Sequence, residues 1–208
     1  MTAFSPMPTI RDGSVFPSGD AASFSGIVLA EALRPSAAAD TTLQSLFAAT
    51  ARVATISGEV EAARLTPGMR VLTRDSGYRP VRSVRASGLD ALIQVAAGRL
   101  GNAFDLCLSP RTGLLITAPC FGELYGAAEV LVPAESLIDG DGVTMLRRPQ
   151  AVQMITLDLG DSEVIWADGV SVGCGDRTQP AARPVLTGRN AVIAARLAGF
   201  GAADRLVA

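Results

Sequence analysis

Short runs of branched and apolar residues, separated by turn residues, limit the possible fold of this chain more than any other feature. From residue 52 to about residue 175 the runs recur roughly every 8–12 residues, with Gly, Pro, Asp or Ser between them. This spacing is typical of an all-β sandwich or barrel. Two tips, Ser57–Glu59 and Asp75–Arg79, are predicted to be hairpin turns in which a glycine supplies the positive φ angle. The stretch 105–117 predicts two strands joined by a polar corner at Ser109–Gly113.

The two ends of the chain have a different texture. Residues 1–45 form an N-terminal arm, rich at its start in Ser, Pro and Gly, for which we predict partial disorder or short helices at 25–35 and after Asp40. The β domain is predicted over 46–175. Residues 176–208 are predicted to be a linker and a C-terminal helix, capped by Thr187 and docked on the β core. Its predicted apolar face consists of Val192, Ile193, Leu197 and Phe200.

Composition removes several classes of function. The 208-residue chain has a net charge of -2 and a pI near 5.2, so no nucleic-acid partner is expected. All 18 basic residues are arginines, which excludes amine-nucleophile chemistry. There is no histidine, and with it the commonest general base and metal ligand are missing. We therefore expect no cofactor and no metal site.

Three cysteines, two charged clusters and the hydropathy pattern complete these constraints. Cys107, Cys120 and Cys174 are too irregularly spaced for a zinc or redox motif and are expected to be reduced thiols, with Cys174 the most exposed. No segment reaches the roughly 18 apolar residues of a membrane helix, and no Sec signal peptide is recognisable. A cytoplasmic location without membrane contact is therefore expected, with leaderless export left open.

Two clusters of charged residues are expected to be solvated surface charges. For the carboxylates the alternative is a calcium site, and for the arginines it is an anion site. The carboxylates are Asp158, Asp161, Glu163 and Asp168, and the arginines are Arg79, Arg82 and Arg85.

Five ordered stretches carry a resemblance to a known family. They are LFAATARVATISGEVEAARLTPGMRVLTRDSG, RPVRSV, LCLSPRTGLLI, AEVLVPAESLIDGDGV and ITLDLGDSEVIWADG, which together span about 130 residues. In this order they resemble the Hint (hedgehog/intein) domain, specifically the bacterial Hint-type modules. The resemblance implies a horseshoe of short strands. It also implies self-directed acyl chemistry, in which the first residue of the domain attacks the peptide bond before it and a histidine protonates the leaving amide nitrogen.

The residues that would perform this chemistry are substituted in this sequence. When the family opening, Cys-Phe-x-x-Gly-Thr, is laid over this sequence, Leu46 falls in the nucleophile position. The glycine that the family has near Thr50 is missing here. Ser109 and Pro110 match the family's Ser/Thr-Pro-x-His block, which places Thr112 in the histidine position. Basic residue-His in the family corresponds to Glu135-Ser136, and a further histidine to Ser162. Leucine has no lone pair with which to attack, and a threonine hydroxyl is too weak an acid to deliver a proton near neutral pH.

The sequence therefore predicts a catalytically silent Hint-like domain that acts as a structural or protein-interaction module and is not an enzyme. Its expected partner is another protein or a peptide segment. The alternative is an autoprocessing domain that cleaves or transfers its N-terminal arm by an N-to-O acyl shift. Ser45, Thr50 and Ser109 are the weak candidate residues for that chemistry. A Ser45 nucleophile would be shifted by one place, and a one-residue shift in a strand turns a side chain to the opposite face.

Overall fold

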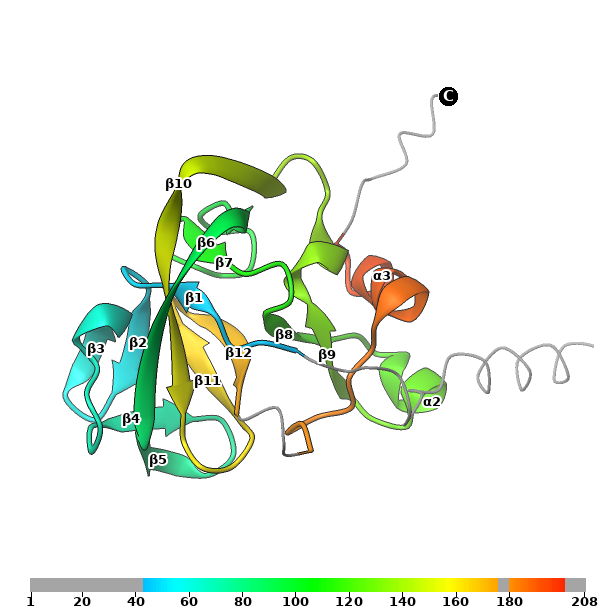
Figure 1. The fold of residues 1–208 in the computed structure, drawn as a ribbon. Helices are drawn as coiled ribbons and strands as arrows, with labels where there is room; N and C mark the ends of the chain where they lie inside the picture. Colours follow the sequence, from blue (N-terminus) through cyan, green and yellow to red (C-terminus); the bar gives the residue numbers. More distant parts are fainter. Residues whose placement is uncertain (1–42, 176–179, 201–208) are drawn as a thin grey trace, which may run out of the picture.

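A computed structural model describes residues 43–175 and 180–200 (Figure 1). The helix predicted at 25–35 lies outside the described residues. The helix predicted after Asp40 is not present over residues 43–48, where Gln44 and residues 47–48 lie in β pairings. The strands are β1 (Phe47–Ala48), β2 (Arg52–Thr55), β3 (Gly58–Glu61), β4 (Arg70–Thr73), β5 (Gly77–Pro80), β6 (Ser83–Val95), β7 (Leu106–Leu108), β8 (Gly113–Thr117), β9 (Glu129–Pro133), β10 (Val143–Asp158), β11 (Glu163–Ala167) and β12 (Val170–Cys174). The helices are η1 (Ala62–Arg64), α2 (Phe121–Tyr125), η2 (Ala134–Leu137) and α3 (Gly188–Leu197).

Two antiparallel sheets contain all of these strands. In the first, β1, β10, β6 and β7 are hydrogen-bonded in a closed ring. The second follows the order β3-β2-β4-β11-β12-β8-β9, with β5 paired to β4. The prediction of an all-β fold with a C-terminal helix is confirmed.

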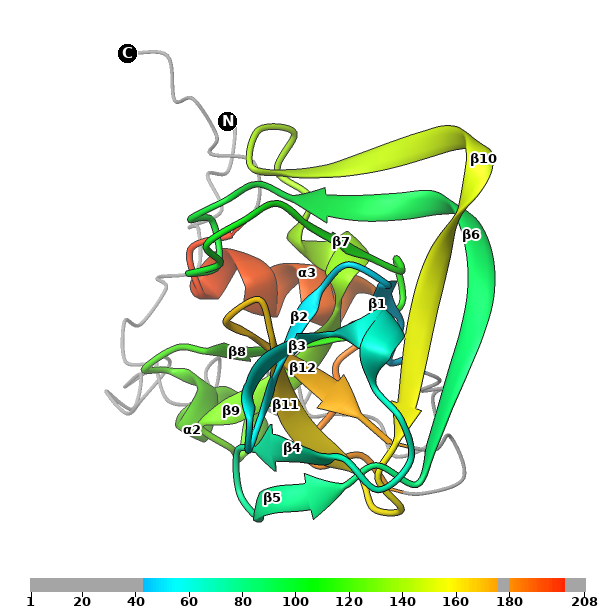
Figure 2. The ribbon, with the colours of Figure 1, turned by 90° about the vertical axis from the view of Figure 1, so that its left-hand side faces the viewer.

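The two longest strands, β6 and β10, form a bent ribbon that curves around the outside of the molecule (Figure 2). Their register shifts between Arg147 and Val152, which pair with Ala91 and Leu89. Residues 148–151 therefore bulge from β10. Pro149 lies in this bulge, where the N–H that proline lacks is not needed by the ladder. The bulge explains how two long strands turn a corner without losing their pairing on either side.

Both predicted hairpin tips are present, and each depends on a glycine. Gly58 follows the β2–β3 turn with a φ of 99°, and Gly77 follows the β4–β5 turn with a φ of 65°. These are left-handed conformations that side chains other than glycine rarely adopt. The hydroxyls of Thr55 and Thr73 reinforce the turns by donating to the carbonyls of Gly58 and Gly77, at 2.6 and 2.8 Å.

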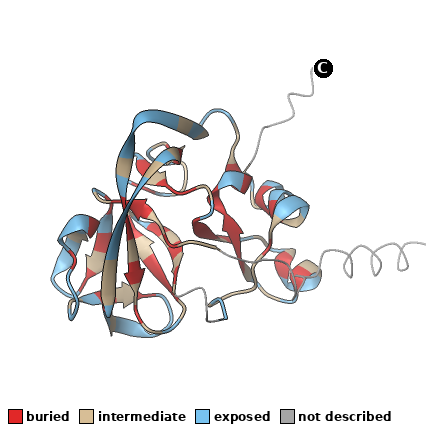
Figure 3. Cartoon of the chain, viewed as in Figure 1, coloured by how far each residue is buried: buried red, intermediate tan, exposed pale blue. Residues whose placement is uncertain are grey.

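The apolar core lies where the two sheets meet. Buried positions dominate β9, β11 and β12, whereas the outer arm of the β6–β10 ribbon and much of β3 are exposed (Figure 3). The largest fully buried side chains include Phe47 of β1 and Phe121 of α2. Burial of this apolar surface is the main force that stabilises the domain.

The C-terminal segment docks on the outer edge of β9. The N–H of Leu131 donates to the carbonyl of Pro184, and the N–H of Leu186 donates to the carbonyl of Leu131, both at 2.9 Å. The Arg183 guanidinium secures this segment through Asp75 at 2.7 Å and Glu129 at 2.9 Å. An edge strand that would otherwise offer unpaired backbone groups is thereby covered.

Helix α3 begins after Thr187 as predicted, but the Thr187 side chain makes no capping hydrogen bond. The helix turns only part of its predicted apolar face to the core, where Ile193 and Phe200 pack. Its buried residues are Ala191, Ala194 and Ala195, whereas Val192 and Leu197 are 40% and 45% exposed. The prediction that the larger apolar residues all face inward is therefore wrong. The short alanine side chains allow the helix to approach η2 and β9 closely. No helix among the described residues is long and apolar enough to cross a membrane.

Candidate functional site

The polar corner between β7 and β8 forms the floor of the candidate site. The N–H of Thr112 donates to the carbonyl of Ser109 at 3.0 Å, which closes the turn. Helix η2 holds the corner from behind, because the N–H groups of Ala134 and Glu135 donate to the carbonyls of Thr112 and Pro110 at 2.9 and 3.0 Å. The corner is thus fixed by the fold on both sides.

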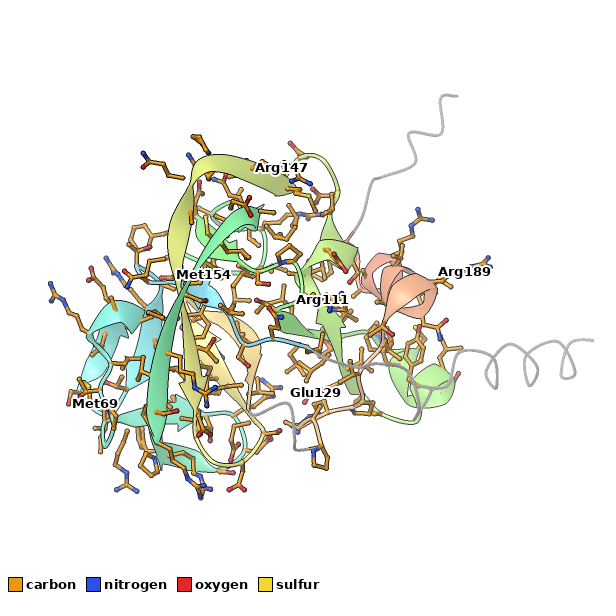
Figure 4. The ribbon with its side chains drawn as sticks, viewed as in Figure 1. Met69, Arg111, Glu129, Arg147, Met154 and Arg189 are labelled. Atoms are coloured by element: carbon orange, nitrogen blue, oxygen red, sulfur yellow. The ribbon has the colours of Figure 1, made fainter. Side chains whose placement is uncertain are left out.

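Residues 43–46, which precede the domain's first strand, lie along this corner. The N–H of Gln44 donates to the carbonyl of Arg111 at 2.8 Å, and the N–H of Gly113 donates to the carbonyl of Gln44 at 3.3 Å. Gln44 and Thr112 form a parallel β-bridge. Arg111 lies near the middle of the molecule in Figure 4, beside this segment. The peptide bond between residues 45 and 46 is therefore held at the corner.

Two donors of the corner converge on the carbonyl of Leu46. The N–H of Ser109 donates at 3.0 Å and the hydroxyl of Thr112 donates at 2.5 Å. Thr112 is fully buried. Its one hydroxyl proton is committed to a carbonyl acceptor one residue beyond the 45–46 peptide bond.

The side chains of Ser45 and Leu46 point to different surroundings. Ser45 is buried, and its hydroxyl donates to the carbonyl of Gly173 in β12 at 2.6 Å. Leu46 packs against a small apolar cluster that includes Leu92 and Met154. The contact between Ser45 and Gly173 could not be predicted from the sequence, because these residues are 128 positions apart and no local pattern links them.

The remaining hydroxyls named from the sequence are those of Ser109, Thr50 and Ser136, and each has different surroundings. Ser109 is buried in the corner, where its hydroxyl accepts from the N–H of Arg111 at 3.3 Å and lies 3.5 Å from the Gln44 side-chain oxygen. Thr50 is exposed in the turn after β1. The Ser136 hydroxyl is turned to the carbonyl of Pro133 at 2.6 Å. The structure therefore brings together Ser45, Leu46, Ser109 and Thr112, but not Thr50.

Cys174 is not the exposed thiol that the sequence suggested. It is buried, and its sulfur donates to the carbonyl of Leu157 at 3.3 Å. Burial raises the pKa of this thiol to about 12, with the nearby carboxylates of Asp158 and Glu163 adding to the effect. Although Cys174 follows Gly173 directly, its thiol stays protonated at neutral pH and is inert both as a nucleophile and as an acid.

The acidic cluster and Arg79 have ordinary structural partners. Asp161 and Glu163 both face Arg79, at 2.5 and 3.8 Å. Asp158 accepts from the N–H of Gly160, and Asp168 accepts from the N–H of Arg52. Among the described residues no group of three or more His, Cys, Asp or Glu side chains is arranged to hold a metal ion.

A cavity of about 390 Å³ lies away from the candidate site. It opens between the end of β8 and the start of β12 and is also lined by Arg99 and Phe200. None of the residues predicted to act in catalysis lines it.

Comparison with known proteins identifies the family. The sequence model of the Hint domain family matches residues 46–173, which is more than half of the chain. The chain therefore belongs to the Hint domain family, an autoprocessing family. A comparison with curated protein sequences gives no match.

Three solved structures illustrate how distant the structural relatives are. The AceL NrdHF class 3 split intein is 14% identical and has a TM-score of 0.48, covering 64% of this chain and 99% of the intein. A bacterial intein-like domain from Clostridium thermocellum is 12% identical with a TM-score of 0.46, covering 63% and 98%. The MchDnaB-1 intein is 10% identical with a TM-score of 0.42, covering 62% and 99%.

Proposed function

We propose that this Hint domain is catalytically silent and acts as a structural or protein-interaction module rather than as an enzyme. One observation carries the proposal: the peptide bond between residues 45 and 46 lies at the corner, but neither reactive group of the family is beside it. Leu46 offers no atom that can attack. The Thr112 hydroxyl donates a hydrogen bond to the Leu46 carbonyl, in the position where the family has a histidine that transfers a proton. Loss of a general acid alone typically slows such a step by about 10²–10⁴-fold.

The partner in this proposal is a protein or a peptide segment, and no cofactor is required. A cytoplasmic location belongs to the same proposal, because the three cysteines are free thiols and a reducing compartment keeps them so. A pull-down from the native host with the full chain, and with the chain lacking residues 1–45, would test the interaction role. Specific capture by both would place the interaction on the Hint domain. Capture by neither would count against an interaction module.

The alternative proposal is autoprocessing through Ser45, and one contact favours it over the other hydroxyls. Ser45 would attack the carbonyl of Gln44, and that carbonyl accepts a hydrogen bond from the N–H of Gly113. The Ser45 hydroxyl, however, gives its own proton to the carbonyl of Gly173, which is not a base. Intact mass of the purified full chain separates the two proposals. The silent domain gives one species over days, whereas a fragment that begins at Ser45 or Thr50 would establish autoprocessing.

A further inference from the structure

The second sheet is split between β8 and β12. β8 pairs with β9 over all five of its residues, and β12 pairs with β11 over all five of its own. Between β8 and β12, however, the described residues pair only at Leu114 and Val172. Beyond this pair the strands separate, and the cavity of about 390 Å³ opens between residues 115–117 and residues 169–171. A volume of this size lies in the range of small-ligand sites.

The backbone edge of β8 faces this cavity. Leu131 of β9 lies opposite Leu115, and it directs both of its backbone groups away from β8. Its N–H donates to the carbonyl of Pro184, and its carbonyl accepts from the N–H of Leu186. In an antiparallel ladder, both residues of such a non-hydrogen-bonded pair turn their backbone groups outward. The N–H and carbonyl groups of Leu115, and by alternation those of Thr117, therefore point to the side of β8 where the cavity lies.

The backbone edge of β12 faces the same cavity. Val164 of β11 lies opposite Gly173, and its carbonyl accepts from the N–H of Arg74, outside the β11–β12 ladder. Gly173 accordingly turns its backbone groups away from β11, and its carbonyl accepts from the Ser45 hydroxyl. By the same alternation, Ser171 turns its backbone groups toward the cavity. The walls of the cavity are thus two strand edges, to which an extended peptide can hydrogen-bond.

Both charged residues that line the cavity, Arg74 and Arg99, are arginines. Each is held by a carboxylate that does not line the cavity: Arg74 by Glu129, and Arg99 by Asp139, which accepts from its Nε and Nη2 atoms at 2.8 Å. The Arg99 guanidinium also lies 5.6 Å from the centre of the Phe200 ring. A guanidinium has five N–H donors, so these contacts position both arginines and leave further donors for a ligand. The ligand group that a guanidinium matches best is a carboxylate or a phosphate.

We propose that the cavity between β8 and β12 binds an extended peptide segment of another protein, and that this segment carries an acidic side chain. Its backbone pairs with the strand edges at 115–117 and 169–171, and its carboxylate binds the free donors of Arg74 and Arg99. Apolar lining residues such as Leu100 and Val170 contact its aliphatic neighbours. This inference rests on the proposed interaction role and adds the place and the chemistry of the partner.

Amide chemical shifts of the isotope-labelled full-length protein test the proposal. The probe is the blocked tripeptide acetyl-Val-Asp-Val-amide, and the control is its uncharged isostere acetyl-Val-Asn-Val-amide. We expect the Asp probe to cause saturable shifts that are confined to the amides of residues 99–100, 115–117 and 169–171. The Asn probe should cause shifts at the same strand edges but bind at least about tenfold more weakly, because it lacks the charge that the arginines recognise. Sodium acetate, which has no peptide groups, should shift the strand amides far less than the Asp probe.

The double variant Arg74→Gln/Arg99→Gln removes both guanidinium groups. It should bring the affinity for the Asp probe down to that for the Asn probe and leave binding of the Asn probe unchanged, which a misfolded cavity would not do. Arg64→Gln is the matched control, because Arg64 is exposed, pairs with Glu61 at 3.4 Å and does not line the cavity. This variant should bind both probes like the wild type.

Shifts that do not saturate, equal affinity for the two probes, or the same response to acetate as to the Asp probe would overturn the proposal. Binding of the Asp probe that appears only after deletion of residues 201–208 would also overturn it, by assigning the cavity to the chain's own tail. The pull-down reports on the interaction role separately. A specific partner that the wild type and Arg74→Gln/Arg99→Gln capture equally would support that role and overturn this site.

Discussion

Replacement of Thr112 by valine tests whether this residue now serves as a structural tie. The two side chains have nearly the same shape, so Thr112→Val removes the hydrogen bond to the Leu46 carbonyl without opening a large cavity. Because Thr112 is fully buried, no water replaces the lost donor. The Leu46 carbonyl keeps its second donor, the N–H of Ser109, and is not left unpaired.

The expected cost follows from these contacts. One intramolecular hydrogen bond contributes about 0.5–1.5 kcal/mol net, and the higher penalty of an orphaned buried acceptor is avoided. We therefore expect Thr112→Val to lower the free energy of unfolding by about 1 kcal/mol. In a domain of this size that corresponds to a fall in Tm of roughly 2–4 °C.

Urea denaturation followed by circular dichroism, together with hydrogen exchange, measures both the size and the place of the effect. Thr73→Val is the control, because Thr73 is also buried and its hydroxyl donates to a backbone carbonyl, but in the distant β4–β5 turn, where it also accepts from the N–H of Ser76. Thr73→Val should lose at least as much stability, but only Thr112→Val should speed exchange of the Gln44 and Gly113 amides. A loss below about 0.3 kcal/mol, or equal exchange in the two variants, would refute the structural role of Thr112.

Two further predictions concern titratable groups. Burial raises the pKa of Glu129, but hydrogen bonds from Arg183 and Arg74 outweigh it, so this pKa lies below its usual value of 4.5. The stability that the Glu129 carboxylate contributes is therefore complete above about pH 4.5 and is lost as the pH falls through the lowered pKa. In urea melts measured from pH 7 to pH 3, Glu129→Gln should make the fall of the free energy of unfolding with decreasing pH less steep. The second prediction is that iodoacetamide labels the partly exposed Cys120 in the folded protein but not Cys174. Peptide mass spectrometry that finds Cys174 modified without denaturant would contradict its burial.

Local signals in the sequence were sufficient for the turns and for the corner. Glycines such as Gly58 and Gly77 mark positive φ angles by themselves, and the apolar runs on either side of the polar corner in 105–117 predict the two strands that the corner joins. The ordered family stretches then placed Leu46 and Thr112 at one site, and the structure brings these two residues into contact.

Features that depend on tertiary packing were not predictable in the same way. The buried residues of α3 are alanines, whose short side chains let the helix lie close to η2, whereas helical periodicity alone also favours the larger Val192 and Leu197 as inward residues. Cys174 is buried by strands that are remote in sequence. The contact of Ser45 with Gly173 depends on how β12 is placed beside the segment before β1.

Hydroxylamine treatment of the folded full-length protein, followed by intact mass, tests the central claim most directly. Hydroxylamine cleaves esters and thioesters, so it reports an acyl shift at the 44–45 peptide bond, through Ser45, or at the 45–46 peptide bond, through a nucleophile at residue 46. Leu46→Cys, which supplies a thiol at the family's nucleophile position, is the matched comparison. Cleavage in this variant but not in the wild type would show that the missing nucleophile is the cause of the inactivity. We expect the wild-type mass to remain unchanged. A wild-type fragment that begins at Ser45, with a hydroxamate on Gln44, would contradict the claim.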